Sequence, residues 1–407
     1  MNDTQKIALN TAVQLAGKAV TVATSVLIVA YLARSLGVEG YGDYATVFAY
    51  LGVFGVIVDL GLFITAVREI AKNPSVEKGI LGNMLGLKLS LGAVMFGAAY
   101  GLSFLLPYPE IVRQGILLGA VSQFFISLNQ VPLGSFQASL TMYQAALSDV
   151  VGRLFLLGLV WWYASHQGGL MEMIWAVVVA NGLVFGLNVL MVGWRYWLVP
   201  LFDLTQWKKI LAASLPVGLV MILGVIYFRI DTLMLAGLKG SFAVGIYSAP
   251  YKILEVLMAV PSIFMSSVLP IMTAALKRSL QEAQRVFQRA FDFSCLASLP
   301  LIVGTVVVAI PIMTLIAGPE FSLSGPVLRV LIFSLGASFL NSVMIYTLMA
   351  AEEQKRLIIP YAIAVIFNVT ANLIFIPRFS YWGAAGVTVL TEVWVLIAST
   401  YILQKHL

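Results

Sequence analysis

Two ionisable residues of opposite charge lie inside a long apolar run, in the stretch YFRIDTLMLAG that begins at Tyr227. Arg229 and Asp231 are two positions apart, so on a helix their side chains point roughly 200° apart and do not pair with each other. In a membrane, such groups need a partner or a polar cavity, and they are the usual contacts for substrates and ions. This stretch is therefore the first candidate for a functional site.

Eight other ionisable residues also lie in the interior of apolar segments, away from the segment ends, which gives five cations and five carboxylates in all: Lys18, Lys88, Arg153, Arg229 and Lys252 against Asp59, Asp149, Asp231, Glu255 and Glu392. Asp149 with Arg153, and Lys252 with Glu255, have helical spacing, so each pair can neutralise itself. Lys88 is expected to extend to the cytoplasmic membrane surface. The ten charges sum to zero, so they do not by themselves establish a cationic cavity.

Arg229 and Asp231 have no such local partner. At 1.5 Å per residue, Arg229 lies about 6 Å to the outer side of the midpoint of its segment, and Lys252 lies at a similar depth in the next one. Two arrangements fit this spacing. Either Arg229 pairs with Glu255 and Asp231 with Lys252, in a network that joins two helices, or the set faces a cavity.

Polar residues recur at helical spacing on four segments, two in each half of the chain. These polar stripes are Asn10, Gln14, Lys18, Thr21 and Ser25; Gln123, Ser127, Gln130 and Gln137; Ser248, Lys252, Glu255, Ser262 and Ser266; and, less tightly spaced, Ser334, Ser338, Asn341 and Tyr346. Each Ser or Thr taken singly is more typical of contacts between helices, but four wide stripes favour a hydrated cavity between two lobes. We select these residues as substrate-binding candidates: Lys18, Arg229, Lys252, Gln14, Gln123 and Gln130. We select these carboxylates as ion-coupling or charge-network candidates: Asp59, Asp231, Glu255 and Glu392.

The composition identifies the class of protein. Of the 407 residues, 60% are hydrophobic and 10% are charged, which fits a polytopic membrane protein and no soluble class. The net charge of +6 is then attributed to basic cytoplasmic loops rather than to nucleic-acid binding. One cysteine and two distant histidines predict no metal cluster, and no cofactor is expected.

No phosphate-binding loop is present, because Gly17-Lys18 lacks both the upstream glycine and the following Ser or Thr. The chain is therefore not expected to hydrolyse ATP or to be an enzyme. Uphill transport would need an ion gradient or a partner. A membrane-embedded transferase would place its acids near a membrane surface and add a sizeable loop, and neither feature is evident.

Twelve segments are long enough to cross a hydrocarbon core of about 30 Å, and a count of eleven or thirteen stays open because several gaps between them are short. They are 9–33, 44–67, 80–106, 111–138, 144–166, 171–194, 210–237, 243–269, 290–317, 325–350, 356–377 and 382–404. With a cytoplasmic N-terminus, 14 Lys and Arg residues lie on the inside and 5 on the outside. This asymmetry predicts that both termini are cytoplasmic.

A weak internal repeat divides the chain. Gly42 and Tyr44 match Gly245 and Tyr247, and each pair follows a span and a glycine-bearing loop. Repeats of this kind are common in transporters. We predict an N-terminal lobe over residues 1–200 and a C-terminal lobe over residues 201–407, with six helices in each.

Three stretches resemble the polysaccharide-biosynthesis (Wzx-type) flippases of the multidrug/oligosaccharidyl-lipid/polysaccharide exporter superfamily. They are ARSLGVEGYGDYATVFAYLGVFGVIVDLGL, YFRIDTLMLAGLKGSFAVGIYSAPYKILEVL and LMAAEEQKRLIIPYAIAVIFNVTANLIFIPRFSYWGAAGVTVLTE. The resemblance implies an all-α, MATE-like membrane protein with twelve helices in two six-helix lobes around a central cavity. It also implies alternating access in the cell membrane, with a polyprenyl-diphosphate-linked oligosaccharide moved from the cytoplasmic to the outer leaflet.

This substrate suits the residues, because Lys18, Arg229 and Lys252 offer cations for a diphosphate. Membrane lipid, H⁺ or Na⁺, a glycan polymerase and glycosyltransferases are the further partners considered. The main alternative is an ion-coupled multidrug exporter of the same superfamily, with Asp59, Asp231 and Glu392 as its coupling carboxylates. A lipid II flippase fits less well, because such proteins typically have two further helices. A non-transporting membrane scaffold would instead have a dry, charge-paired core.

Overall fold

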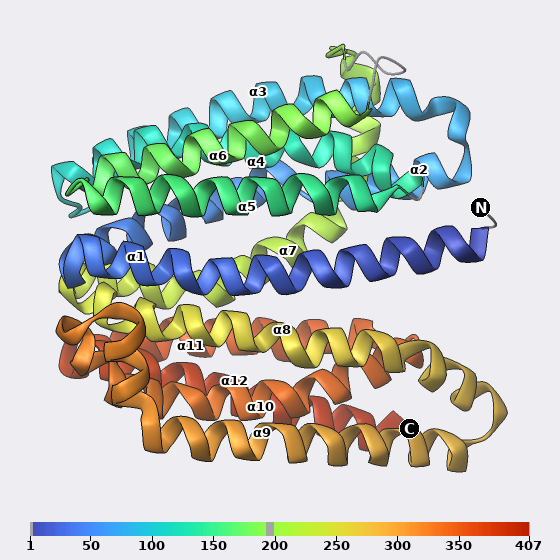
Figure 1. Cartoon of the computed structure of the whole chain (residues 1–407). Helices are drawn as coiled ribbons and strands as arrows, with labels where there is room; N and C mark the ends of the chain where they lie inside the picture. Colours follow the sequence, from blue (N-terminus) through green and yellow to red (C-terminus); the bar gives the residue numbers. More distant parts are fainter. Residues whose placement is uncertain (1–2, 140, 193–198, 407) are drawn as a thin grey trace. The chain divides into compact units, whose positions relative to one another are not determined.

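The computed structural model describes residues 3–139, 141–192 and 199–406, with their side chains except those of 3–12, 14, 15, 74 and 406. Over these ranges the chain is helical and contains no strand (Figure 1). The first half contains α1 (Asp3–Asp59), α2 (Leu62–Lys72), α3 (Glu77–Ser103), α4 (Glu110–Ala138), α5 (Met142–Ser165) and α6 (Leu170–Val192). The second half contains α7 (Leu204–Lys239), α8 (Ser241–Arg278), α9 (Leu280–Ala317), α10 (Ser324–Ala350), α11 (Ile358–Phe379) and α12 (Tyr381–His406). Three short 3₁₀ turns also occur, at Pro74–Val76, Pro319–Leu323 and Gln354–Leu357.

The helices account for the twelve predicted spans, except that residues 193 and 194, at the end of the predicted span 171–194, lie outside the described residues. In the described residues, 11 helical segments are long and apolar enough to cross a membrane. The first of them contains two passes, because α1 is interrupted at Gly37, whose φ of 67° is a left-handed value that glycine adopts without strain. The chain turns there, so residues 3–36 form one pass and residues 38–59, continued by α2, form the next.

The chain divides into two compact units, Met1–Arg229 and Ile230–Leu407. The division falls inside α7. The lobe boundary predicted at residues 200 and 201, and the cavity predicted between the lobes, stay predictions.

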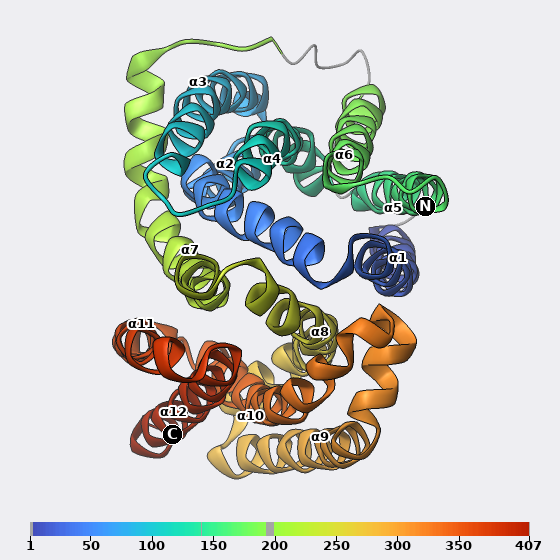
Figure 2. The same cartoon turned by 90° about the vertical axis from the view of Figure 1, so that its left-hand side faces the viewer.

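Unit 1 is built around α4, which packs against α1, α3 and α6, while α5 packs against α1 and α6 (Figure 2). Its apolar core joins α2, α3 and α4 through residues such as Leu62, Met84 and Val131. Trp207 at the start of α7 packs against the same core. The N-terminal part of α7 therefore belongs to unit 1.

Unit 2 is built around α10, which packs against α8, α9 and α12, and α11 packs against α12 (Figure 2). Among the described spans, α10 is the most enclosed. In its most apolar 18-residue stretch 67% of the residues are buried, whereas in that of α9 only 11% are buried. α10 is thus the central helix of unit 2, and α9 leaves most of its surface for lipid.

A close backbone approach fixes α7 against the break between α1 and α2. Leu60 and Gly61 at this break have φ values of 42° and 72°. A Cβ added to Gly218 of α7 would lie 2.6 Å from the carbonyl oxygen of Leu60. Only glycine permits this approach, because the atoms it meets are backbone atoms that cannot rotate away.

Gly218→Ala is therefore expected to destabilise the protein by about 1–3 kcal/mol, because the added methyl group forces two backbones apart. The measurement is thermal unfolding of the purified protein in detergent. Gly224→Ala, on the same helix with no atom within 4 Å of the added Cβ, is the matched control. It should be neutral or slightly stabilising. Equal unfolding temperatures for the two variants would contradict the close approach.

Candidate functional site

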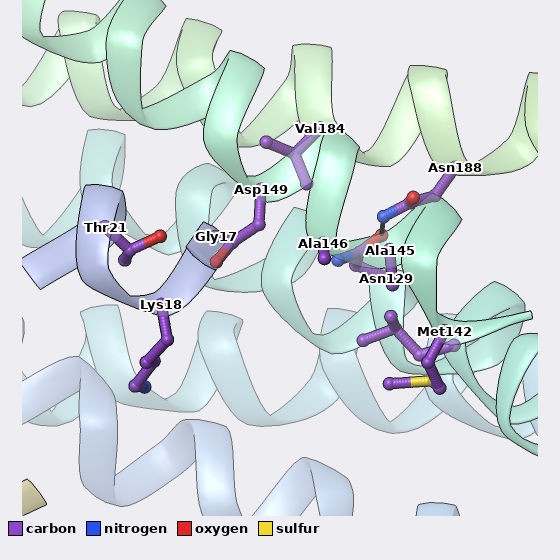
Figure 3. Close-up of a pocket in the computed structure, with 11 residues that line it drawn as sticks. Gly17, Lys18, Thr21, Asn129, Met142, Ala145, Ala146, Asp149, Val184 and Asn188 are labelled. Atoms are coloured by element: carbon purple, nitrogen blue, oxygen red, sulfur yellow. Dashed lines mark hydrogen bonds between the residues drawn. The ribbon is translucent and has the colours of Figure 1, made fainter. Parts of the chain in front are cut away.

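A pocket of about 370 Å³ lies within unit 1, between α1, α4, α5 and α6 (Figure 3). Lys18 and Thr21 line it from α1, Asn129 from α4, Asp149 from α5 and Asn188 from α6. Its volume is within the roughly 300–1,000 Å³ of small-molecule sites. Lys18 is exposed, and its side chain projects away from the two asparagines, so its ammonium group lies at the rim (Figure 3).

The two asparagines of this pocket form a pair. Asn188 Nδ2 donates a hydrogen bond of 2.8 Å to Asn129 Oδ1. Asn188 is only 1% exposed, and its Oδ1 has no hydrogen-bond partner in the described part of the chain. Seven residues earlier on the same two helices, Asn181 Nδ2 donates a bond of 2.8 Å to Ser122 Oγ. α4 and α6 therefore carry two similar polar contacts, and only one of them lines the pocket.

A buried ion pair lies at the break between α1 and α2. Lys88 Nζ of α3 is 2.6 Å from Asp59 Oδ1, and the two side chains are 0% and 13% exposed. Lys88 Nζ also lies 3.5 Å from Ser127 Oγ of α4. The expectation that Lys88 reaches the membrane surface is wrong, because Asp59 and Ser127 stabilise the ammonium group inside the unit.

Asp231 lies at the centre of a buried polar cluster in unit 2. Its Oδ1 accepts a hydrogen bond of 2.6 Å from Asn372 Nδ2, and its Oδ2 accepts one of 2.9 Å from the hydroxyl of Tyr247. Thr388 Oγ1 lies 2.8 Å from the same Oδ2. Asn372 Nδ2 also donates to Asn368 Oδ1 at 3.0 Å. Asp231 is 3% exposed, so these neutral groups replace water around its carboxylate.

The chemistry of this cluster suits a hard cation. Every potential ligand is oxygen, the donor type that Na⁺ shares with other hard cations. Asn372 Oδ1 is buried with no hydrogen-bond partner among the described residues. Thr388 has one hydroxyl proton, and the carbonyl oxygen of Ala384 lies 2.8 Å from it, so the proton can turn there and leave lone pairs facing Asp231.

The other charged candidates lie on α7, α8 and α12. Lys252 Nζ and Glu255 Oε2 form the local pair, at 2.5 Å, with side chains 42% and 21% exposed. Asp231 is bonded to the cluster above rather than to Lys252. Glu392 of α12 is buried, at 7% exposed. Arg229 is half-buried on α7, and its predicted pairing with Glu255 stays a prediction.

The predicted glutamines are spread along unit 1. The amide of Gln123 lies against Gly55 of α1, and Gln130 is half-buried on α4. The side chain of Gln14 lies outside the described residues. Asp149 and Arg153 form no ion pair within the described part of the chain, although their spacing allows one.

Many of the serines in the polar stripes bond to their own helix. Ser25 donates to the carbonyl of Thr21, and Ser334 donates to that of Leu331. Ser266 does the same with Ile263. Helical backbone carbonyls accept such bonds readily, so these hydroxyls need neither a cavity nor a second helix.

Comparison with known proteins identifies the family. The family model described as polysaccharide biosynthesis protein matches residues 7–276, which is well over half of the chain. The chain belongs to the polysaccharide biosynthesis protein family. A second family model, MatE, matches residues 216–374.

One curated relative of this family member is a probable flippase, AglR, of Haloferax volcanii. The two are 27% identical over 172 residues, which is 40% of this chain. The match spans only 35% of the relative's length.

Solved structures share the fold over nearly the whole chain. A lipid II flippase, MurJ, in an inward closed conformation matches with a TM-score of 0.78 and 12% identity, over 98% of this chain and 87% of that one. An inward-facing multidrug resistance MATE transporter of the MOP superfamily matches with a TM-score of 0.77 and 15% identity, over 97% and 99%. The predicted all-α, MATE-like fold is therefore confirmed, and the family member is a multi-pass membrane protein.

Sequence reasoning missed several partners in these clusters. Lys88 was set aside, and Asn129, Asn188, Asn368 and Asn372 were not singled out. Two signals could have identified the asparagines. Asn368 and Asn372 are four residues apart on one apolar helix. Polar residues also recur at an interval of seven on both α4 and α6, where a seven-residue repeat keeps one face towards a neighbour.

Replacing Lys88 with methionine should destabilise the protein by about 3–5 kcal/mol, because Asp59 would be left without its cation in a largely buried place. The measurement is thermal or denaturant unfolding in detergent. The double variant Asp59→Asn/Lys88→Met removes both charges and should recover a large part of this loss. If the double variant were as unstable as the sum of the two single variants, the ion pair would not be the relevant interaction.

Proposed function

We propose that this protein is a flippase that moves a polyprenyl-diphosphate-linked oligosaccharide from the cytoplasmic to the outer leaflet of the cell membrane, for surface polysaccharide synthesis. The observation that carries the proposal is the match of the polysaccharide biosynthesis family model to residues 7–276. In this account the protein works by alternating access of two lobes. Both termini face the cytoplasm, as the distribution of Lys and Arg predicts.

Lys18 is proposed to bind the diphosphate. It is an exposed cation at the rim of a pocket, and it lies within an apolar helix. An ammonium group makes a strong charge-assisted contact with a phosphate oxygen. Arg229 and Lys252 are proposed as further cationic contacts, although Lys252 would have to exchange its partner Glu255 for the phosphate. The polyprenyl chain stays in the bilayer, and glycosyltransferases and a polymerase act before and after translocation.

The cluster around Asp231 is proposed to bind the coupling ion. Asp231, Asn368, Asn372 and Thr388 would hold Na⁺, because all four offer oxygen and Asn372 Oδ1 has no hydrogen-bond partner in the described part of the chain. A proton on Asp231 is the alternative. In either case the charge of a buried carboxylate would be neutralised, which favours the closely packed state of unit 2.

The second candidate function is ion-coupled multidrug export. It is favoured by the MatE model match to residues 216–374 and by the similarity to an inward-facing MATE transporter. The two functions differ in the substrate, and the same ion site serves either one.

Lys18→Ala is expected to reduce surface polysaccharide by about 10-fold or more in the source organism, because one charge-assisted contact contributes roughly 1.5–3 kcal/mol. Lys18→Arg should retain most of the activity. The polysaccharide is measured at equal amounts of the flippase in the membrane.

Lys208→Ala is the control for this experiment, because Lys208 is an exposed lysine near the start of α7 and does not line the pocket. Normal polysaccharide levels in the Lys18→Ala strain would contradict the assignment of Lys18. Loss of dye efflux with normal polysaccharide would favour the multidrug exporter.

Na⁺ is expected to raise the unfolding temperature of the purified protein relative to choline at equal ionic strength, because a ligand that binds only the folded state stabilises it by about 2.7 kcal/mol at 100 times its Kd. Asp231→Asn should abolish this increase. Asp149→Asn, which changes a carboxylate of unit 1, should retain it. An equal Na⁺ effect in both variants would show that the ion binds elsewhere, and an increase on acidification alone would favour the proton.

A further inference from the structure

The pocket of unit 1 is lined by polar side chains other than Lys18, and the proposed contact of Lys18 with the diphosphate gives them no role. Lys18, the proposed phosphate contact, lies at the rim and projects away from the paired amides of Asn129 and Asn188 (Figure 3). A substrate whose phosphate met Lys18 could therefore place its next group in the pocket. In a polyprenyl-diphosphate-linked oligosaccharide, that next group is the first sugar.

The paired amides have hydrogen-bonding capacity that the protein leaves unused. Asn188 Oδ1 is buried without a partner among the described residues, and Asn129 Nδ2 makes no hydrogen bond to another described residue. If both amides were turned over, the bond between them would persist, and one donor and one acceptor would still remain. In either orientation the pair offers one NH group and one oxygen.

A sugar can use both of these groups. Each hydroxyl of a pyranose is a donor and an acceptor, so two neighbouring hydroxyls match an amide NH and an amide oxygen. The rest of the wall supplies a carboxylate acceptor from Asp149 and apolar surface from Leu133 and Val184. Mostly apolar walls with a few convergent polar groups are typical of small-molecule sites, and the apolar residues here suit the CH face of a sugar ring.

A second polar contact joins α4 and α6. It shows that the two helices can pack through such a pair without leaving a buried hydrogen-bonding group unused. Asn181 donates to Ser122 with the same 2.8 Å distance, and this pair does not line the pocket. No atom of Asn181 or Ser122 is both buried and without a hydrogen-bond partner in the described part of the chain. Of these two pairs, only the one at the pocket wall has a buried atom that no described residue bonds.

We propose that this pocket is a saccharide subsite, in which the paired amides of Asn129 and Asn188 contact hydroxyl groups of the sugar next to the diphosphate. The inference rests on the proposed function and adds to it where the sugar is bound and by which residues. Lys18 binds the phosphate at the rim, and the asparagine pair distinguishes a glycosylated carrier from a bare one.

The experiment measures binding of two kinds of lipid to the purified full-length protein in detergent, by competition in native mass spectrometry. One is undecaprenyl diphosphate without a sugar. The others are undecaprenyl diphosphates that carry N-acetylglucosamine, glucose or galactose. The wild-type protein is expected to bind at least one glycosylated lipid about 10-fold more tightly than the bare lipid, as one or two additional hydrogen bonds would give.

Asn129→Leu and Asn188→Leu should each reduce this preference to less than about twofold while the affinity for the bare lipid is unchanged. Asn181→Leu is the matched control, because it removes the equivalent bond between α4 and α6 without altering the pocket, and it should keep the preference. Unchanged binding of the bare lipid shows that each variant is folded, so loss of the preference is then specific to the sugar.

The remaining outcomes separate the inference from the proposed function. If the wild-type protein binds all the lipids equally, or if Asn181→Leu loses the preference as fully as Asn188→Leu, the saccharide subsite is wrong and the flippase proposal stands. If the wild-type protein binds none of the lipids, the proposed function fails and the subsite fails with it.

Discussion

The hydrocarbon core of a membrane offers no hydrogen-bond partners, so each charged or polar side chain there needs a partner inside the protein or a water-filled cavity. This constraint governs the arrangement of the ionisable residues in this chain. Lys88 is fully buried and meets Asp59 at 2.6 Å. Asp231 is 3% exposed and is surrounded by Tyr247, Asn372 and Thr388. In both cases the partners belong to the same compact unit as the charge.

Because these buried charged side chains are paired or hydrogen-bonded within each unit, few buried polar atoms lack a hydrogen-bond partner. Those that do lack one indicate where a ligand could bind. Six buried side-chain atoms have no hydrogen-bond partner among the described residues, and they include Asn188 Oδ1 in unit 1 and Asn372 Oδ1 in unit 2. Asn188 lines a pocket together with Asn129, and Asn372 bonds through its Nδ2 to the buried carboxylate of Asp231. A buried polar atom without a partner is unfavourable unless a ligand or water completes it. The two proposed binding sites rest on these two atoms.

The fold was largely predictable, because each span is a long apolar helix and hydropathy alone identifies it. All twelve predicted ranges correspond to helical passes, and the Gly37 turn separates the first two. The charged clusters were only partly predictable. Spacing along one helix identified the Lys252–Glu255 pair, but Asp59 meets Lys88 from 29 residues away and Asp231 meets Thr388 from 157 residues away. One sequence carries no information on which of many distant helices will be neighbours, so these partners required the structure.

The most direct test of the account is translocation by the purified protein in liposomes. A fluorescent undecaprenyl-diphosphate-linked oligosaccharide is incorporated, and the fraction accessible to an external quencher is followed over time. The account predicts that the protein moves this lipid between leaflets, and that Lys18→Ala slows the movement while Lys208→Ala does not. If the lipid stays in its leaflet while the same liposomes transport a cationic dye against a Na⁺ or H⁺ gradient, the protein is a multidrug exporter and the flippase account is contradicted.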